Sequence, residues 1–263
     1  MKNKIRSMLI RWLRVLESKN TARFSKFWPS YNSKDIPMSI IEIDNEFNKL
    51  YEEAQGLTQM EKSDNAYRRQ RHYTLYYLFK NVLKSEKSEK INIAEIGCWR
   101  GLSAFQTSRT ISDSGMNVQF HIFDSFEGLS EFTPKDESLV ITFDKQDSVR
   151  RNFAYDFEKV KQNLSQYDFI TYYKGWVPSR FNEVEKEEFS FVHIDVDLYE
   201  PTYDCMKFFY PRLKSKGIMV FDDYGATTFL GAQKAVDDYL SLLKKDEFFF
   251  LNLPSTQAFL IKN

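Results

Sequence analysis

Short apolar runs alternate with amphipathic stretches from residue 91 onward. The apolar runs expected to form strands are 91–96, 118–124, 169–173, 189–195 and 218–222. Apolar residues at helical spacing predict helices from Leu102, over 153–164, from Pro201 to a point before Gly217, and over 231–243. Strands that alternate with helices in this way predict an α/β fold with a doubly wound, mostly parallel sheet.

The last part of the sequence departs from this alternation. Two further apolar runs, 248–253 and 257–262, are joined only by Pro254, Ser255 and Thr256. A parallel crossover needs a dozen or more residues, so these two strands must pair as an antiparallel hairpin. The pattern therefore predicts a seven-stranded sheet that is parallel except at its C-terminal hairpin.

Helical patterns also precede the first strand, at 40–57 and 64–83, and a polar linker follows at 84–90. Because these helices come before the sheet, we interpret residues 1–85 as an N-terminal helical region that caps a main domain at 86–263.

The first 24 residues form the one stretch of unbalanced charge. Their single acid is Glu17, apolar residues recur among them at helical spacing, and their seven basic side chains are Lys2, Lys4, Arg6, Arg11, Arg14, Lys19 and Arg23. This basic amphipathic helix either docks on the domain or on a second subunit, or lies on anionic lipid at the inner face of a membrane. Aromatic residues at 12, 27 and 28 are candidates for a homo-oligomer interface.

The overall composition excludes several classes of protein. Lys plus Arg and Asp plus Glu are both 37 among 263 residues, so the electrostatic basis for nucleic-acid binding is missing and we expect no such partner. Cys98 and Cys205 are too few for a disulfide framework, which favours a reducing cytoplasm. No apolar run approaches the ~20 residues that span a bilayer.

Glycines and a carboxylate follow the first two predicted strands. Glu95, Gly97 and Gly101 give the spacing E-x-G-x-x-x-G, which differs from the G-x-G-x-x-G of dinucleotide sites, and Glu95 would face the positive end of an amino-acid moiety. Asp124 ends the second strand, where a carboxylate can accept hydrogen bonds from both ribose hydroxyls of an adenosine. The plainer interpretation is an ordinary glycine turn and an Asp that caps the next turn.

Acids gather after two neighbouring predicted strands. Asp195 ends the fourth strand and Asp197 follows it, while Asp222 ends the fifth strand and Asp223 follows it. Carboxyl ends of one sheet lie together, and converging carboxylates repel each other unless a cation such as Mg²⁺ or Mn²⁺ is present. Helix-capping Asp residues are the alternative. Asp195 and Asp197 are also candidate proton acceptors, whereas His193, in the middle of a strand, fits a packed core histidine.

Motifs between Tyr67 and Tyr239 resemble the macrocin-type O-methyltransferases, which use a metal and S-adenosylmethionine to methylate hydroxyls on sugars of natural products. The motifs are E-I-G-x-x-x-G at 95–101, F-D-S-F-E-G-L at 123–129, K-G-W-V-P at 174–178, I-D-V-D-L-Y-E-P-T at 194–202, Y-P-R-L-K-S-K-G at 210–217 and F-D-D-Y-G at 221–225. The resemblance implies the Rossmann-like class I methyltransferase fold.

The same resemblance implies roles for individual residues. It implies metal ligation by Asp195, Asp222 and Asp223. It implies contacts with S-adenosylmethionine from Glu95, Gly97, Gly101, Ser103, Asp124, Ser125, Gly175, Trp176 and Asp195, with Gly175 and Trp176 near the adenine. We therefore expect a metal-assisted O-methyltransferase that acts on a hydroxyl of a sugar or glycan-type small molecule.

Two departures keep alternatives open. Catechol O-methyltransferases, which this chain resembles more distantly, carry a lysine base where this chain has Leu198, so a carboxylate base is favoured here. Residues 130–151 match the family loosely and are expected to form a mobile lid over the acceptor. A catechol or phenol acceptor, or a non-catalytic binding protein on the same fold, remain the alternatives.

Overall fold

The computed structural model describes residues 40–263 and divides the chain into two compact units, Met1–Asn48 and Lys49–Asn263. The expected basic helix at 1–24 and the aromatic residues at 12, 27 and 28 lie outside the described residues, so the interface and membrane contact assigned to them stay predictions. Among residues 40–263, no helix is both long enough and apolar enough to cross a bilayer.

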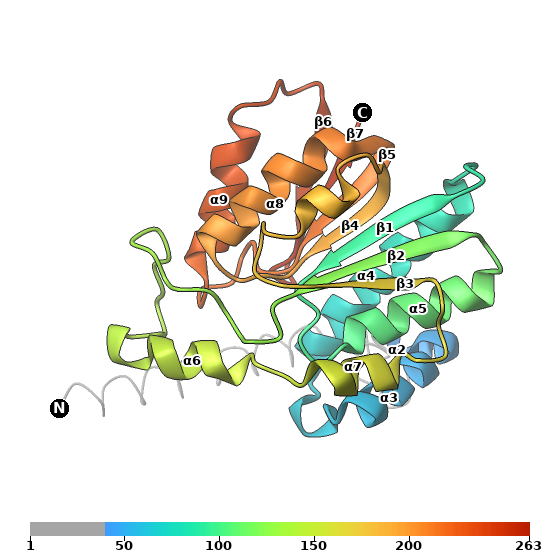
Figure 1. Cartoon of the computed structure of the whole chain (residues 1–263), viewed down its shortest axis with the longest axis horizontal. Helices are drawn as coiled ribbons and strands as arrows, with labels where there is room; N and C mark the ends of the chain where they lie inside the picture. Colours follow the sequence, from blue (N-terminus) through green and yellow to red (C-terminus); the bar gives the residue numbers. More distant parts are fainter. Residues whose placement is uncertain (1–39) are drawn as a thin grey trace, which may run out of the picture. The chain divides into compact units, whose positions relative to one another are not determined.

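The second unit is built on one seven-stranded sheet (Figure 1). Its strands are β1 (Ile91–Ile96), β2 (Val118–Asp124), β3 (Ile170–Lys174), β4 (Phe189–Ile194), β5 (Leu213–Phe221), β6 (Phe248–Asn252) and β7 (Ala258–Lys262). They lie in the order β3-β2-β1-β4-β5-β7-β6. The first five run parallel, and β7 pairs antiparallel with both β5 and β6. The predicted mixed sheet with a C-terminal hairpin is confirmed.

Helices cover both faces of the sheet, with α4 and α5 on one side and α8 and α9 on the other (Figure 1). The helices of the described chain are α2 (Ile40–Ile43), α3 (Asn45–Thr58), α4 (Ala66–Ser85), α5 (Leu102–Ser114), α6 (Gln146–Asn152), α7 (Phe157–Asn163), α8 (Tyr199–Arg212) and α9 (Leu230–Leu240), with short 3₁₀ turns at Glu61–Ser63, Phe143–Lys145 and Phe181–Val184. Every residue of β1 and β4 is buried, as expected for central parallel strands covered on both faces.

Local polar contacts explain where the helices depart from the predicted ranges. The helix expected over 40–57 is interrupted at Asp44, whose carboxylate accepts from the Phe47 amide at 2.9 Å and so caps α3. The helix expected over 153–164 begins later, at Phe157, because Asp156 caps α7 by accepting from the Glu158 amide.

The fifth strand begins earlier than expected. It starts at Leu213, directly after α8, and a bulge at 214–217 with Lys216 at φ 66° shifts its register against β4. The predicted start at Ile218 is therefore wrong, because the apolar pattern resumes only after the bulge.

The turn after β1 brings the backbone of the β1–α5 loop against the end of β4. Gly97 has φ +87°, and a Cβ at this position would lie 1.9 Å from the Asp195 carbonyl oxygen. Gly115, which ends α5, has φ +64° and no neighbouring atom within 4 Å of the same position. Of these two glycines, both have positive φ angles, but only Gly97 also lacks room for a Cβ atom.

Gly97→Ala should therefore destabilise the protein more than Gly115→Ala. Left-handed strain alone costs about 1–2 kcal/mol, and the contact with Asp195 should add a further ~1–3 kcal/mol, because either backbone must move. Urea unfolding of both variants measures the difference. Equal losses would show that the contact at Gly97 is relieved without cost.

Candidate active site

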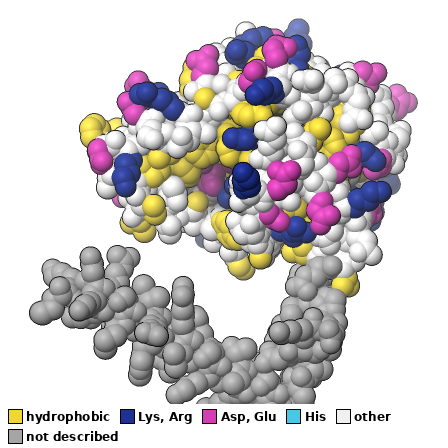
Figure 2. All heavy atoms as spheres, turned by 90° about the horizontal axis from the view of Figure 1, so that it is seen from below, with side chains coloured by type: hydrophobic (Ala, Val, Ile, Leu, Met, Phe, Trp, Pro, Cys, Tyr) yellow, Lys and Arg dark blue, Asp and Glu magenta, His cyan; other side chains and the backbone are white. Residues whose placement is uncertain are grey.

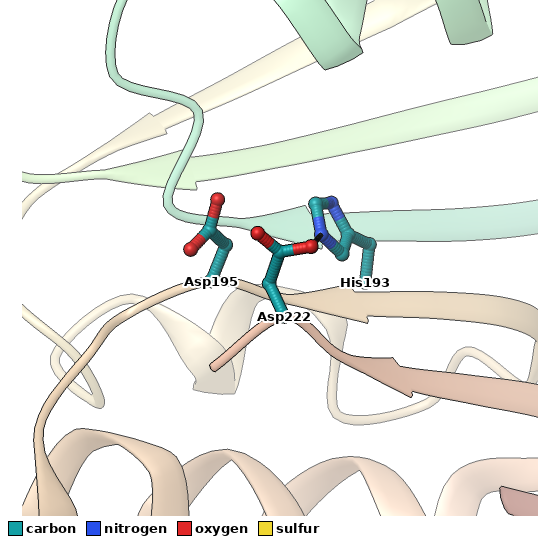
Figure 3. Close-up of side chains that lie close together, drawn as sticks. All are labelled: His193, Asp195 and Asp222. Atoms are coloured by element: carbon teal, nitrogen blue, oxygen red, sulfur yellow. Dashed lines mark ion pairs between the residues drawn. The ribbon is translucent and has the colours of Figure 1, made fainter. Parts of the chain in front are cut away.

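Four carboxylates converge where β4 and β5 end. Ligand atoms of His193, Asp195 and Asp222 lie within 4.8 Å of one another, as do those of Asp195, Asp197 and Asp223. Figure 3 shows the Asp222 carboxylate pointing toward the His193 ring, with Asp195 beside it. The structure thus brings together all the acids that the sequence placed at these two strand ends.

A guanidinium from α4 compensates part of this negative charge. Arg71 Nη2 donates to the Asp222 carboxylate, to the Asp222 carbonyl oxygen at 3.1 Å and to Asp223 Oδ1 at 3.0 Å. Gln257, fully buried at the start of the β7 segment, donates through Nε2 to Asp222 Oδ1 at 2.6 Å. Asp222 is therefore held by donors from two segments far from it in sequence.

His193 is a buried residue that lies next to two acids, Glu95 and Asp222. Its Nδ1 is 3.1 Å from Glu95 Oε1, and its Nε2 is 3.5 Å from Asp222 Oδ1 and has no hydrogen-bond partner. Both His193 and Glu95 are buried. Glu95, which the sequence assigned to the cofactor, lines neither of the two cavities described below.

Burial and mutual repulsion disturb the acids of the cluster. Burial, and then the neighbouring Asp223, raise the pKa of Asp195 to about 7. Burial, and then Asp223 and Asp195, also raise the pKa of Asp197 well above its usual range. Asp223 Oδ2 is buried without a hydrogen-bond partner. When ionised, the four carboxylates together would carry more negative charge than Arg71 compensates, and their oxygen atoms are the ligands that suit a hard divalent cation.

The backbone at Asp197 is strained. Asp197 has φ 60°, and the Leu198 amide donates to the Val196 carbonyl at 2.6 Å, which closes a γ-turn of the rarer positive-φ kind around Asp197. Non-glycine residues such as Asp rarely adopt this backbone conformation, and where they do, they are often found at functional sites. The turn places the Asp197 side chain at the boundary of both cavities.

Asp124 fixes the loops at the ends of β1 and β2. Its Oδ2 accepts from the amides of Cys98 and Trp99 at 2.7 and 2.9 Å, and its Oδ1 accepts from Phe126 at 2.7 Å. Burial raises the pKa of Asp124, and the three amide donors oppose that rise. Asp124 therefore caps the turn that follows β2, and its carboxylate also lines a cavity.

The first cavity opens beside this loop and has aromatic walls. Of the expected cofactor residues, it is lined by Gly97, Asp124, Ser125, Gly175, Trp176 and Asp195. Trp99, Phe123 and Phe153 add further rings. Gly101 begins α5 at φ 84° and lines neither cavity, so its part is to shape the loop.

The second cavity adjoins the first, because Trp99, Phe153, Asp195 and Asp197 line both. It has a volume of about 400 Å³ and includes Asp222, Asp223 and Ser103 in its wall. The opposite part of the wall comes from α4, through Arg68, Arg71, His72 and Leu75. Ser103 thus lies at this cavity and not at the aromatic one.

Residues 130–151, expected as a lid, are held to the rest of the domain at several points, and one of them is a buried carboxylate. Asp136 is buried, and its Oδ1 accepts from the Tyr199 amide at 2.6 Å, so it caps α8 from a distant loop. Its Oδ2 accepts from Thr133 at 2.8 Å. Beyond this anchor Leu139, Val140 and Phe143 are exposed.

Sequence reasoning missed Arg71, Gln257 and Asp136. Arg71 had a weak signal, since Arg68, Arg71 and His72 share one face of a helix that precedes the sheet. Gln257 and Asp136 had none, because each acts on a residue that is distant in sequence.

Solved structures place this fold among the class I methyltransferases. The O-methyltransferase NovP superposes with a TM-score of 0.64 at 18% identity, over 82% of this chain and 98% of that one. The calicheamicin methyltransferase CalS11 gives 0.62 at 16% identity, over 87% and 99%. At such identities the likeness concerns the fold.

The sequence places the chain more narrowly. The family described as Macrocin-O-methyltransferase (TylF) matches residues 63–247, and the chain belongs to this family. The 8-demethyl-8-(2,3-dimethoxy-alpha-L-rhamnosyl)-tetracenomycin-C 4'-O-methyltransferase of Streptomyces olivaceus is 26% identical over 156 residues. Demethyldecarbamoylnovobiocin O-methyltransferase of Streptomyces niveus is 26% identical over 159 residues. The chain spans just over half the length of these two relatives, 57% of each.

Replacing Arg71 with Gln should destabilise the metal-free protein strongly. Removal of one partner from a buried ion pair typically costs about 3–5 kcal/mol, because the remaining charges are left uncompensated. Urea unfolding in EDTA measures this, with Arg109→Gln as the control, since Arg109 pairs with Asp113 and Glu53 at the surface. Arg71→Lys should recover part of the loss. Equal effects at 71 and 109 would contradict the role assigned to Arg71.

Asp195→Asn should stabilise the metal-free protein in a pH-dependent way. Asp195 has a pKa of about 7 in the fold and of ~3.9 in an unfolded chain. Between these values only the native state keeps the proton, so the wild type loses stability as pH rises from ~4 to ~7. The difference in free energy of unfolding between the variant and the wild type should increase over that pH range, by at most ~1.4 kcal/mol per pKa unit. Above that range the difference should stay constant. Urea unfolding in EDTA at several pH values tests this; a constant difference would refute the raised pKa.

Proposed function

We propose that the protein is an S-adenosylmethionine-dependent, Mg²⁺-assisted O-methyltransferase that acts on a hydroxyl of a sugar or glycan-type small molecule. The observation that carries this proposal is the pair of adjoining cavities with a shared acidic border. One has aromatic walls and Asp124, which suits an adenosine, and the other contains the acidic cluster. Asp195 and Asp197 line both, so a donor and an acceptor would meet at these two acids.

The residues present fit both absent groups. Asp195, Asp222 and Asp223 would hold the cation. The ligand atoms of Asp195 lie within 4.8 Å of those of His193 and Asp222 in one group and of those of Asp197 and Asp223 in another, and Asp223 Oδ2 has no hydrogen-bond partner. Trp176 and Phe123 would enclose the adenine, while Asp124 and Ser125 would face the ribose. When bound, S-adenosylmethionine supplies an electrophilic methyl group, and a divalent cation lowers the pKa of a nearby hydroxyl.

Methyl transfer to a hydroxyl oxygen releases a proton, and a side chain beside the acceptor would take it up. Asp197 is the candidate, since it lies beside the cation ligands and its raised pKa suits it to hold a proton. Leu198, at the position where catechol O-methyltransferases carry a lysine, is buried in a cluster with Leu129 and Phe229. A carboxylate base is thus favoured over a lysine.

The names of the relatives support the choice of acceptor. The Streptomyces olivaceus enzyme is named for O-methylation of a compound that carries a rhamnosyl group. A sugar presents neighbouring hydroxyls, and two such oxygens can approach one cation held by three carboxylates. We therefore extend the sugar acceptor to this chain as part of the proposal.

Calorimetric titration of S-adenosylmethionine and of Mg²⁺ tests the cofactor and the metal separately. The wild type should bind both, and Asp223→Asn should weaken Mg²⁺ binding at least about tenfold, because a charged oxygen ligand is lost. Asp113→Asn, on the exposed part of α5, is the matched control and should change neither. Absence of S-adenosylmethionine binding with and without Mg²⁺ would refute the proposed function.

A further inference from the structure

The acidic cavity has a basic side that the reaction described above does not use. Arg68 and Arg71 line it from successive turns of α4, and Arg100 lines it from the β1–α5 loop. His72 lines the same cavity, and burial followed by Arg71 and Arg68 lowers its pKa to about 3, so it stays neutral. The positive charge on this wall therefore comes from the three arginines.

Two of these arginines lack a counter-ion. Arg71 is paired with Asp222 and Asp223, but among residues 40–263 neither Arg68 nor Arg100 has a carboxylate within ion-pair distance. Arg100 Nε is in addition buried with no hydrogen-bond partner. Unpaired guanidinium groups that share a partly buried cavity favour an anionic ligand, because it compensates both charge and lost hydration.

Arg100 is also held in place. Its guanidinium lies over the rings of Trp99 and Tyr155, 5.1 and 4.9 Å from their centres. A planar guanidinium that lies over two rings is restricted in orientation, and its N–H groups suit the tetrahedral oxygens of a phosphate. The cavity begins at the positive end of the 20-residue helix α4, since Asn65 and Tyr67 line it, and this adds to the same preference.

We propose that the acceptor carries a phosphate group, which Arg68 and Arg100 bind while its hydroxyls lie against the acidic cluster. This inference rests on the proposed function and narrows its substrate class to phosphorylated sugars. The cavity has acids at one side and unpaired arginines at another, and its volume of about 400 Å³ lies within the usual range of small-molecule sites. A neutral glycoside would leave both arginines uncompensated.

Two sources of phosphate share this chemistry, a sugar monophosphate and a sugar linked to a nucleoside diphosphate. Calorimetry on the full chain with Mg²⁺ and S-adenosylhomocysteine bound would compare glucose 1-phosphate, UDP-glucose and neutral methyl glucoside. At least one phosphorylated probe should bind about tenfold or more tightly than methyl glucoside. The tighter of the two phosphorylated probes identifies the source. Equal affinity for the neutral glycoside would overturn the proposal.

Arginine variants assign the binding to these side chains. Arg68→Gln and Arg100→Gln should each weaken the phosphorylated probe about tenfold or more and leave S-adenosylhomocysteine affinity within about twofold. Arg109→Gln, whose arginine is paired at the surface of α5, is the control and should change neither. Loss of S-adenosylhomocysteine affinity in Arg100→Gln would instead assign Arg100 to the cofactor and overturn the proposal.

The two proposals can fail separately. If S-adenosylhomocysteine binds and no phosphorylated probe does, the substrate class is wrong and the methyltransferase proposal stands. If S-adenosylhomocysteine does not bind at all, the proposed function itself fails.

Discussion

Compensation of the negative charge at the ends of β4 and β5 is the constraint on which the rest of this structure depends. Four carboxylates share a small, mostly buried space, and such an arrangement is unfavourable without a cation. The guanidinium of Arg71 provides a positive charge from α4, and Gln257 adds a hydrogen bond from the segment that leads into β7. Helix, central strands and C-terminal hairpin are thus tied to one point.

A second network holds the neighbouring loops at a fixed distance from that point. Asp124 accepts three backbone amides, and Gly97 allows the β1–α5 loop to contact the backbone of Asp195. The aromatic cavity and the acidic cavity consequently share a rigid border. On the face of the described chain seen in Figure 2, basic and acidic side chains are interspersed around hydrophobic surface, as the balanced composition suggests.

The sequence was sufficient for the sheet and for the acids, because both follow from local patterns. Apolar runs gave the strands, the short link at 254–256 required the hairpin, and strand ends brought Asp195 and Asp222 together. It was insufficient where a distant side chain decides the outcome. Glu95 lies 3.1 Å from His193 and lines neither of the two adjoining cavities, and Arg71 reaches Asp222 across 151 positions, which no spacing rule predicts. Likewise the bulge at 214–217 interrupts the pattern that marks β5.

The Arg71 bridge has a consequence for how the protein would acquire an ion in the cell. Small zinc domains fold only once their metal is bound, whereas here a tethered cation already occupies the acidic cluster. Under the proposed function, binding of a divalent ion would be an exchange in which the guanidinium of Arg71 gives up its position. Such an exchange lowers the net affinity of the acidic cluster for a divalent ion. The occupancy of the site would then follow the free concentration of abundant divalent ions and would not depend on a protein that delivers the metal.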